Sequence, residues 1–133
     1  MAVLIHPPKP DLAAQRESVT LALPQLVSAL VDILGKKLTA YVVSAKDVRT
    51  VDRWRTGDES LKAYKGVATK LRVTYHIAKL LSEYESHRVV QSWFMGLNPE
   101  LDDRSPARLL READIESSGP EVLRAVRAFL AGG

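Results

Sequence analysis

The sequence predicts an all-α protein, and three observations support this prediction. Apolar residues recur at helical spacing in several separate segments. No segment shows the alternation or the β-branched run of a convincing strand, since Tyr41-Val42-Val43 is too short alone. The chain has 133 residues, 46% hydrophobic and 26% charged, as is typical of a soluble domain that buries its own core. We expect a helical bundle joined by a long helix to a second, smaller helical domain.

The N-terminal residues 1–17 carry three early prolines and no periodic apolar pattern, so we expect an extended arm. Met1 to Ile5 is apolar but too short for a signal peptide or a membrane span. The chain has no cysteine, which excludes disulfides and thiolate chemistry and fits a reducing compartment. We therefore expect a cytoplasmic protein with no membrane partner.

The region 18–84 is expected to hold four helices, over about 23–34, 36–43, 47–55 and 61–84. The first has the apolar spacing of an amphipathic helix and is expected to end at Gly35. Asp47 is a good N-cap and Gly57 a good stop for the third. The fourth has a lysine-rich outer face. The helix 23–34 is either the interface of a dimer or buried within one subunit.

The region 87–133 is expected to be a second helical unit. A short, very apolar helix should follow His87 and stop at Gly96 and Asn98-Pro99. Ser105-Pro106 reads as a cap followed by a proline in the first helical position, and Gly119-Pro120 repeats this device before the last helix. The apolar residues that define these helices are Val89, Val90, Trp93, Phe94, Leu97, Leu109, Leu110, Val122, Leu123, Val126, Phe129 and Leu130.

The sequence offers little for catalysis. Asp102 and Asp103 are adjacent, no nucleophile–base pair is evident, and there is no glycine loop that would hold a phosphate. His6, His76 and His87 lie far apart and lack the spacing of metal ligands. We therefore expect no enzyme activity, no cofactor and no metal.

Charge is distributed unevenly along the chain. The formal net charge is +3, but between Lys36 and Lys79 eleven basic residues face only four acidic ones. From His87 onward, six arginines face seven acidic residues. A basic segment suits an anionic partner such as DNA, whereas a mixed segment suits a protein.

The segment 38–57 reads as two short helices about a tight turn, the pattern of a helix-turn-helix. Val48, Val51 and Trp54 would hold the second helix against the core and leave its polar side free to meet DNA. Lysines nearby, including Lys62 and Lys65, would contact phosphates. The candidate DNA-binding residues are Lys36, Lys37, Lys46, Arg49, Thr50, Arg53 and Arg55.

The competing interpretation of this segment is a solvated helix face. Two residues depart from the usual helix-turn-helix pattern: Tyr41 stands where a small residue often lets the helices cross, and Ala45 where glycine often makes the turn. Asp52 would repel phosphate unless it pairs with an arginine or accepts a hydrogen bond from cytosine.

The stretch 90–111 holds the most specific pattern in the chain. Its elements are Trp93, Asn98-Pro99, Leu101-Asp102, Ser105-Pro106 and the pair Leu109-Leu110. This pattern resembles the C-terminal toxin-binding domain of the Xre/MbcA/ParS antitoxin family. Lys37 to Tyr41 and Arg49 to Trp54 are also similar to the helix-turn-helix region of that family, so the resemblance covers roughly residues 24–131.

The resemblance implies an antitoxin that binds and blocks a RES-domain toxin, an enzyme that consumes NAD or transfers ADP-ribose. It also implies repression of its own operon and a homodimer, which would match a palindromic DNA site. For Trp93 we favour core packing. The candidate toxin-binding residues are Phe94, Met95, Leu97, Asn98, Pro99, Leu101, Arg104, Ser105, Arg108, Arg111 and Leu130. The alternative is a stand-alone helix-turn-helix regulator of phage or plasmid origin with no toxin partner.

Overall fold

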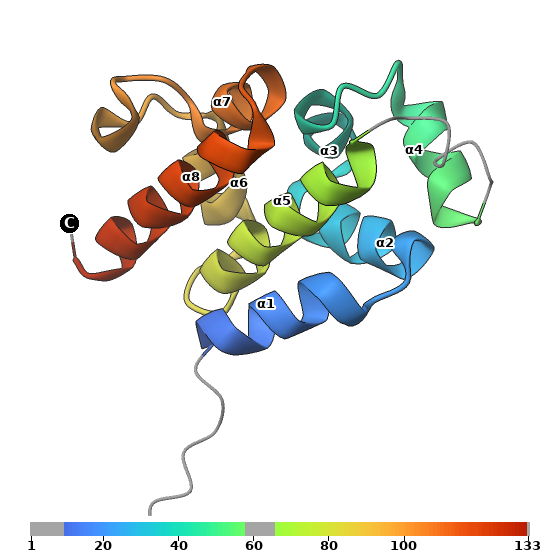
Figure 1. Ribbon diagram of the computed structural model, residues 1–133, viewed down its shortest axis with the longest axis horizontal. Coiled ribbons are helices and arrows are strands. Elements are labelled where there is room, and N and C mark those ends of the chain that lie inside the picture. The colour runs from blue at the N-terminus through green and yellow to red at the C-terminus, as the bar shows by residue number, and fades with distance from the viewer. Residues whose placement is uncertain (1–9, 58–65, 133) are drawn as a thin grey trace, which may run out of the picture.

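The computed structural model describes residues 10–57 and 66–132 of the chain. These residues form α-helices, one short 3-10 helix and no named strand, which confirms the all-α prediction (Figure 1). Between Pro10 and Leu130 the elements are α1 (Pro10–Thr20), α2 (Leu23–Leu34), α3 (Lys36–Val42), α4 (Val48–Arg55), α5 (Val67–Ser82), α6 (His87–Met95), η2 (Pro99–Leu101), α7 (Pro106–Glu112) and α8 (Ile115–Leu130).

Helix α5 is the centre of the packing. It contacts α1, α2, α6 and α8, and Figure 1 shows it running between α1 and α8. Leu71, Ile77 and Leu81 on this helix are almost completely buried, which explains why its apolar residues extend beyond a single stripe. The predicted helix began at residue 61, but residues 61–65 lie outside the described residues, and α5 begins after Gly66.

The buried side chains of the described residues form a single hydrophobic cluster. It includes Ala14 of α1, Trp54 of α4, Phe94 of α6 and Val126 of α8. The regions 18–84 and 87–133 therefore contribute side chains to a common core. Within the described residues, no helix is both long enough and apolar enough to cross a membrane.

The helices of the basic segment lie where the sequence places them. α2 ends at Gly35, whose φ of +84° is a conformation that favours glycine. α4 begins after Asp47, whose side chain accepts a hydrogen bond from the backbone N–H of Thr50 at 2.9 Å. The buried residues of α2 pack inside the subunit, so this stripe is part of the core and not a free dimer surface.

The first two helices of the C-terminal region also follow their sequence signals. Ser86 caps α6, and Gly96 follows its last turn. Ser105 caps α7 by accepting a hydrogen bond from the backbone N–H of Arg108 at 3.1 Å, with Pro106 in the first helical position. Both predicted ends of α6 and the predicted start of α7 are therefore confirmed.

The prediction of an extended arm is wrong for residues 10–17, which belong to α1; residues 1–9 lie outside the described part of the chain. Pro10 occupies the first position of the helix, where a backbone N–H would have no hydrogen-bond partner within the helix, so a proline is tolerated. Only Ala14 and Ser18 of this helix are buried, so its sequence has almost no apolar stripe. Polar contacts with α5 and α8, described below, hold it instead.

The prediction that Gly119-Pro120 starts the last helix is also wrong. α8 begins at Ile115 and runs through both residues. A Cβ atom at Gly119 would lie 2.9 Å from Cγ1 of Val73, so glycine is needed because α8 approaches α5 closely there. The absence of a Cβ at Gly119 also removes one of the two contacts, with Cβ and with the backbone N–H, through which a proline normally clashes with the residue before it.

Candidate functional site

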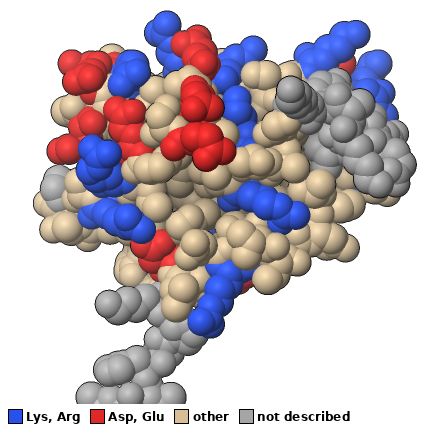
Figure 2. All heavy atoms as spheres, viewed as in Figure 1, with Lys and Arg blue, Asp and Glu red and all other residues tan. Residues whose placement is uncertain are grey.

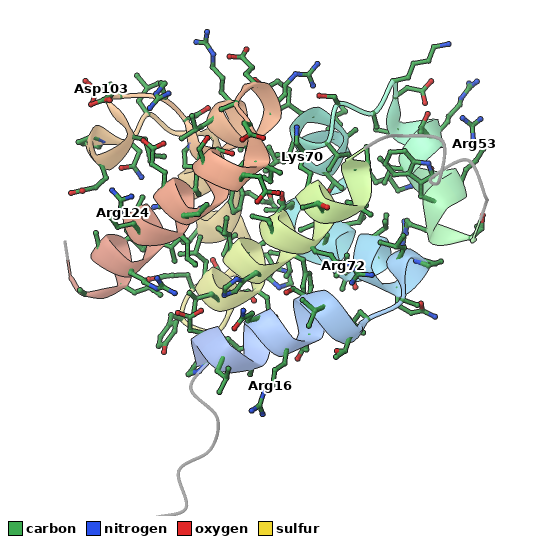
Figure 3. All side chains as sticks on the ribbon, viewed as in Figure 1. Arg16, Arg53, Lys70, Arg72, Asp103 and Arg124 are labelled. Atoms are coloured by element: carbon green, nitrogen blue, oxygen red, sulfur yellow. The ribbon has the colours of Figure 1, made fainter. Side chains whose placement is uncertain are left out.

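The first candidate surface is the outer side of α4. Val51 and Trp54 are fully buried and anchor the helix, as predicted, while Arg49 and Arg53 are exposed one turn apart. Figure 3 shows Arg53 directed away from the body of the protein. Lys46, in the turn before α4, is exposed as well. These three side chains form what we call the α4 basic face.

Two other residues that were predicted to contact DNA, Lys36 and Arg55, form ion pairs within the protein. Asp52 lies 3.0 Å from Nζ of Lys36 and 3.6 Å from a guanidinium nitrogen of Arg55. Arg55 also donates a hydrogen bond to Oγ of Ser28 at 3.5 Å. Asp52 thus neutralises part of the positive charge on this side of α4. The α4 basic face therefore contains fewer basic residues than the sequence suggested.

Thr50 is not available to read bases in this conformation. It is 1% exposed, and its hydroxyl donates to Oδ1 of Asp47 at 3.0 Å. The two hydrogen bonds from Thr50, one from its backbone and one from its side chain, hold the pKa of Asp47 below its ordinary value. The residue therefore fixes the start of α4, and its inclusion among the DNA contacts is corrected.

The turn before α4 accommodates Tyr41 and Ala45, the two residues that depart from the usual helix-turn-helix pattern. Ser44, and not Ala45, takes the left-handed conformation, with φ of +58°. Tyr41 is 39% exposed, so its ring does not stand between α3 and α4, which are in contact. Lys62 and Lys65 lie outside the described residues.

The second candidate surface is an apolar groove where α3 meets α6 and α7. Its volume is about 780 Å³, and it is open to solvent. The residues that line it are Leu34, Gly35, Lys36, Lys37, Leu38, Tyr41, Gln91, Met95, Ser105 and Ala107. We call this feature the α3–α7 groove. It brings Lys37, predicted to contact DNA, together with Met95 and Ser105, predicted to bind a partner.

Two large apolar side chains of the partner motif are exposed. Met95 is 59% exposed and lines the α3–α7 groove, and Leu97, two residues further on, is 76% exposed. Phe94 and Leu101, by contrast, are fully buried, so both are corrected from surface anchors to core residues. Trp93 is half-buried against the core, with its ring 5.6 Å from that of Phe94 and 6.4 Å from that of Phe129. Leu130 is also packed partly against the core.

The loop after α6 is closed by its own hydrogen bonds. Asn98 donates from its backbone N–H to the carbonyl of Arg104 at 3.1 Å and accepts at its own carbonyl from Asp103 at 2.9 Å. Its side chain accepts from the backbone N–H of Glu100 at 2.9 Å. Asp102 and Asp103 both take left-handed conformations, with φ of +56° and +59°, and both are exposed. The loop therefore presents two carboxylates in a backbone geometry that its hydrogen bonds maintain.

The arginines of the motif serve the fold to different degrees. Arg111 donates to the carbonyl of Tyr41 at 2.6 Å, with its guanidinium 4.6 Å from the centre of the Tyr41 ring. Arg104 donates to the carbonyl of Leu101 and pairs with Glu121 at 3.3 Å. Arg108 pairs with Glu112 and is exposed. Pro99 is exposed as well. Arg111 thus ties α7 to α3 along one border of the α3–α7 groove.

Charge is unevenly distributed over the face of the molecule that Figure 2 shows. In Figure 2, acidic side chains gather over the part of the molecule that Figure 1 assigns to α7 and the loop before it. Lys and Arg side chains stand at the end that carries α4. The uneven distribution along the sequence therefore also appears on this face of the folded molecule.

A polar cluster holds α1 to α5 and α8, and sequence reasoning missed it. Oδ1 of Asp11 lies 2.7 Å from Nε2 of His76, and Oδ2 lies 2.8 Å from a guanidinium nitrogen of Arg127. Partial burial raises the pKa of Asp11, but the hydrogen bonds from His76 and Arg127 outweigh this and hold it below its ordinary value. At the other end of α1, Arg72 donates to the carbonyls of Ser18 and Leu21 at 2.8 and 3.0 Å.

Comparisons with known proteins do not place the chain in a family. A scan against protein-family models, a search of curated proteins and a search of solved structures each found no match. Within the described residues, no three His, Asp or Glu side chains form a group that could hold a metal ion. The case for a function therefore depends on the motif and on the two surfaces.

Proposed function

We propose that this protein is the antitoxin of a toxin–antitoxin pair, which binds and inhibits a RES-domain toxin and represses its own operon. One observation carries the proposal. The motif that resembles the toxin-binding domain of Xre/MbcA/ParS antitoxins borders an apolar groove of about 780 Å³ and leaves Met95 and Leu97 exposed. Large exposed apolar side chains beside a groove are typical of a protein-binding surface.

The loop that follows Leu97 supports the same proposal. Asp102 and Asp103 are consecutive residues in the left-handed conformation, which non-glycine residues adopt rarely and aspartate more readily than most. The hydrogen bonds of Asn98 keep the loop in this shape before any partner arrives. Such pre-organisation lowers the entropy cost of binding, which favours a role in recognition.

The second role in the proposal, DNA binding, depends on the α4 basic face. Arg49 and Arg53 project from a short helix that is anchored by Trp54 and begins at a capped turn. In this role the two arginines contact bases or phosphates, and Lys46 contacts phosphate. Two copies of the chain would read two half-sites of a palindromic operator.

The experiment is co-expression with the product of the adjacent open reading frame. We expect the neighbour alone to arrest growth, and co-expression with this chain to restore growth and yield a stable complex. A harmless neighbour that does not co-purify would contradict the antitoxin role. The vector without this chain is the control for rescue.

The alternative is a stand-alone DNA-binding regulator, and one observation favours it. The α4 basic face needs no partner, since Arg49 and Arg53 are already exposed in the isolated chain. Binding to the upstream DNA at low salt, with a harmless neighbouring gene product, would select this alternative. Absence of binding to any duplex at low salt would eliminate it.

A further inference from the structure

The α3–α7 groove joins parts of the chain that the sequence assigned to different roles. One wall comes from α3 and the end of α2, within the predicted DNA-binding region, and the other from α6 and α7, within the partner motif. Arg111 and Tyr41 hold these walls together through the contact between guanidinium and carbonyl at 2.6 Å. A ligand in the groove would therefore touch both regions at once.

The lining of the groove indicates the chemistry of its occupant. It is mostly apolar, with Leu38, Tyr41 and Met95 partly or largely exposed. Its charged residues are Lys36 and Lys37, both cations. Lys36 already pairs with Asp52 at 3.0 Å, whereas Lys37 is exposed and makes no ion pair with any described residue. An occupant that complements this surface has large apolar side chains and a carboxylate placed to meet Lys37.

We propose that the α3–α7 groove binds an amphipathic helix of the toxin that carries several large apolar side chains and an acidic residue paired with Lys37. The inference rests on the proposed function and names the part of the partner that this surface recognises. An amphipathic helix with apolar side chains at positions i, i+3 or i+4, and i+7 is a common occupant of an apolar groove between helices. Lys37 is thereby reassigned from DNA contact to partner contact.

A second copy of this chain fits the groove less well. Near the loop of residues 98–104, the large exposed apolar side chain is Leu97. The exposed residues of the loop are Pro99 and the acidic Glu100, Asp102 and Asp103. One leucine does not fill about 780 Å³.

The test measures affinity for the toxin encoded by the adjacent gene in two groove variants of the full chain. Met95→Glu places a carboxylate among the apolar contacts, and we expect it to weaken binding by about 30-fold or more. Lys37→Glu reverses the charge that meets the acidic residue, and we expect a loss of about tenfold. Unchanged circular dichroism and thermal unfolding show that each variant is folded.

Matched controls lie on α1, away from the groove. Val19→Glu is the control for Met95→Glu, because it also replaces an exposed apolar residue, here 63% exposed, with a carboxylate. Arg16→Glu is the control for Lys37→Glu, because it reverses an exposed charge that Figure 3 shows pointing outward. We expect both controls to bind the toxin within about twofold of the unmodified chain, as for surface changes outside an interface. An acidic-to-lysine change in the toxin helix should restore binding to Lys37→Glu.

A photo-crosslinking residue at Tyr41 separates the possible occupants. A crosslink to a helix of the toxin supports the inference. A crosslink to a second copy of this chain, or unaltered toxin affinity in both groove variants while the complex still forms, overturns the inference and leaves the proposed function standing. Failure of the unmodified chain to bind the neighbour removes the proposed function, and this inference with it.

Discussion

The α4 basic face and the α3–α7 groove are opposite kinds of surface supported by one core. On α4 the apolar residues Val51 and Trp54 point inward and charges point outward. At the groove, Met95 is 59% exposed although it is apolar. Lys36 links the two regions, since it pairs with Asp52 of α4 and also lines the groove. This small helical fold therefore presents one surface suited to an anion and a separate surface suited to an apolar partner.

The largest expected effect concerns the shared core. Trp54 anchors α4 and Phe94 anchors α6, and both are fully buried. We expect Trp54→Ala and Phe94→Ala each to lower the free energy of unfolding by about 3–5 kcal/mol. Because their side chains belong to one cluster, each variant should shift a single cooperative transition followed by circular dichroism in urea. Two separate transitions, each sensitive to one variant, would show that the surfaces rest on independent domains.

The next effect separates the two surfaces by their ligands. We expect Arg49→Ala or Arg53→Ala to weaken DNA binding by about 1–3 kcal/mol if the residue contacts a base. Loss of a phosphate contact should reduce the slope of log affinity against log salt by about 1. Fluorescence anisotropy with the upstream DNA at several salt concentrations measures both quantities. Met95→Ala is the control and should bind DNA normally, so equal losses in all three variants would abolish the distinction between the surfaces.

A smaller effect is expected at the rim of the groove. Ser105 caps α7 and lines the groove, so Ser105→Ala removes the hydrogen bond to the backbone N–H of Arg108. We expect it to lower the free energy of unfolding by about 1 kcal/mol. Ser92→Ala, at an exposed position on α6, should change it by less than about 0.5 kcal/mol. Denaturant titration of both variants provides the comparison, and equal values would mean that the cap does not stabilise α7.

The smallest effect concerns α1, which carries neither surface. Because the pKa of Asp11 is lowered in the folded protein, its contribution to stability is present above the unfolded pKa of about 4 and is lost as pH falls through the lowered value. We therefore expect the stability of Asp11→Asn to depend less on pH in the acidic range than that of the unmodified chain. The pH dependence near neutral pH should change less. Thermal unfolding between about pH 2 and pH 7 measures this. An unaltered acid side would mean that His76 and Arg127 do not stabilise the carboxylate.

Local signals predicted the helices that carry both surfaces. Gly35, Asp47 and Ser105 act through their own backbone geometry or through hydrogen bonds to residues three positions away, and such signals are readable in a sequence. The burial of Val51 and Trp54 followed from helical spacing in the same way.

Long-range contacts explain what could not be predicted. α1 lacks an apolar stripe and is held by Asp11, whose partners His76 and Arg127 lie far along the chain. Gly119 resembles a helix breaker, but its role is set by Val73 of α5. The α3–α7 groove combines Tyr41 with Met95 and Ala107, so no local pattern indicates it.

The proposed function is the inhibition of a toxin that consumes NAD or transfers ADP-ribose. The most direct test is to titrate the purified chain into the purified product of the adjacent gene and to measure NAD consumption. The account predicts that the neighbour consumes NAD alone and that a stoichiometric amount of this chain stops it, while Met95→Glu requires a large excess. A neighbour that leaves NAD intact, or one whose activity persists at every ratio, would contradict the account.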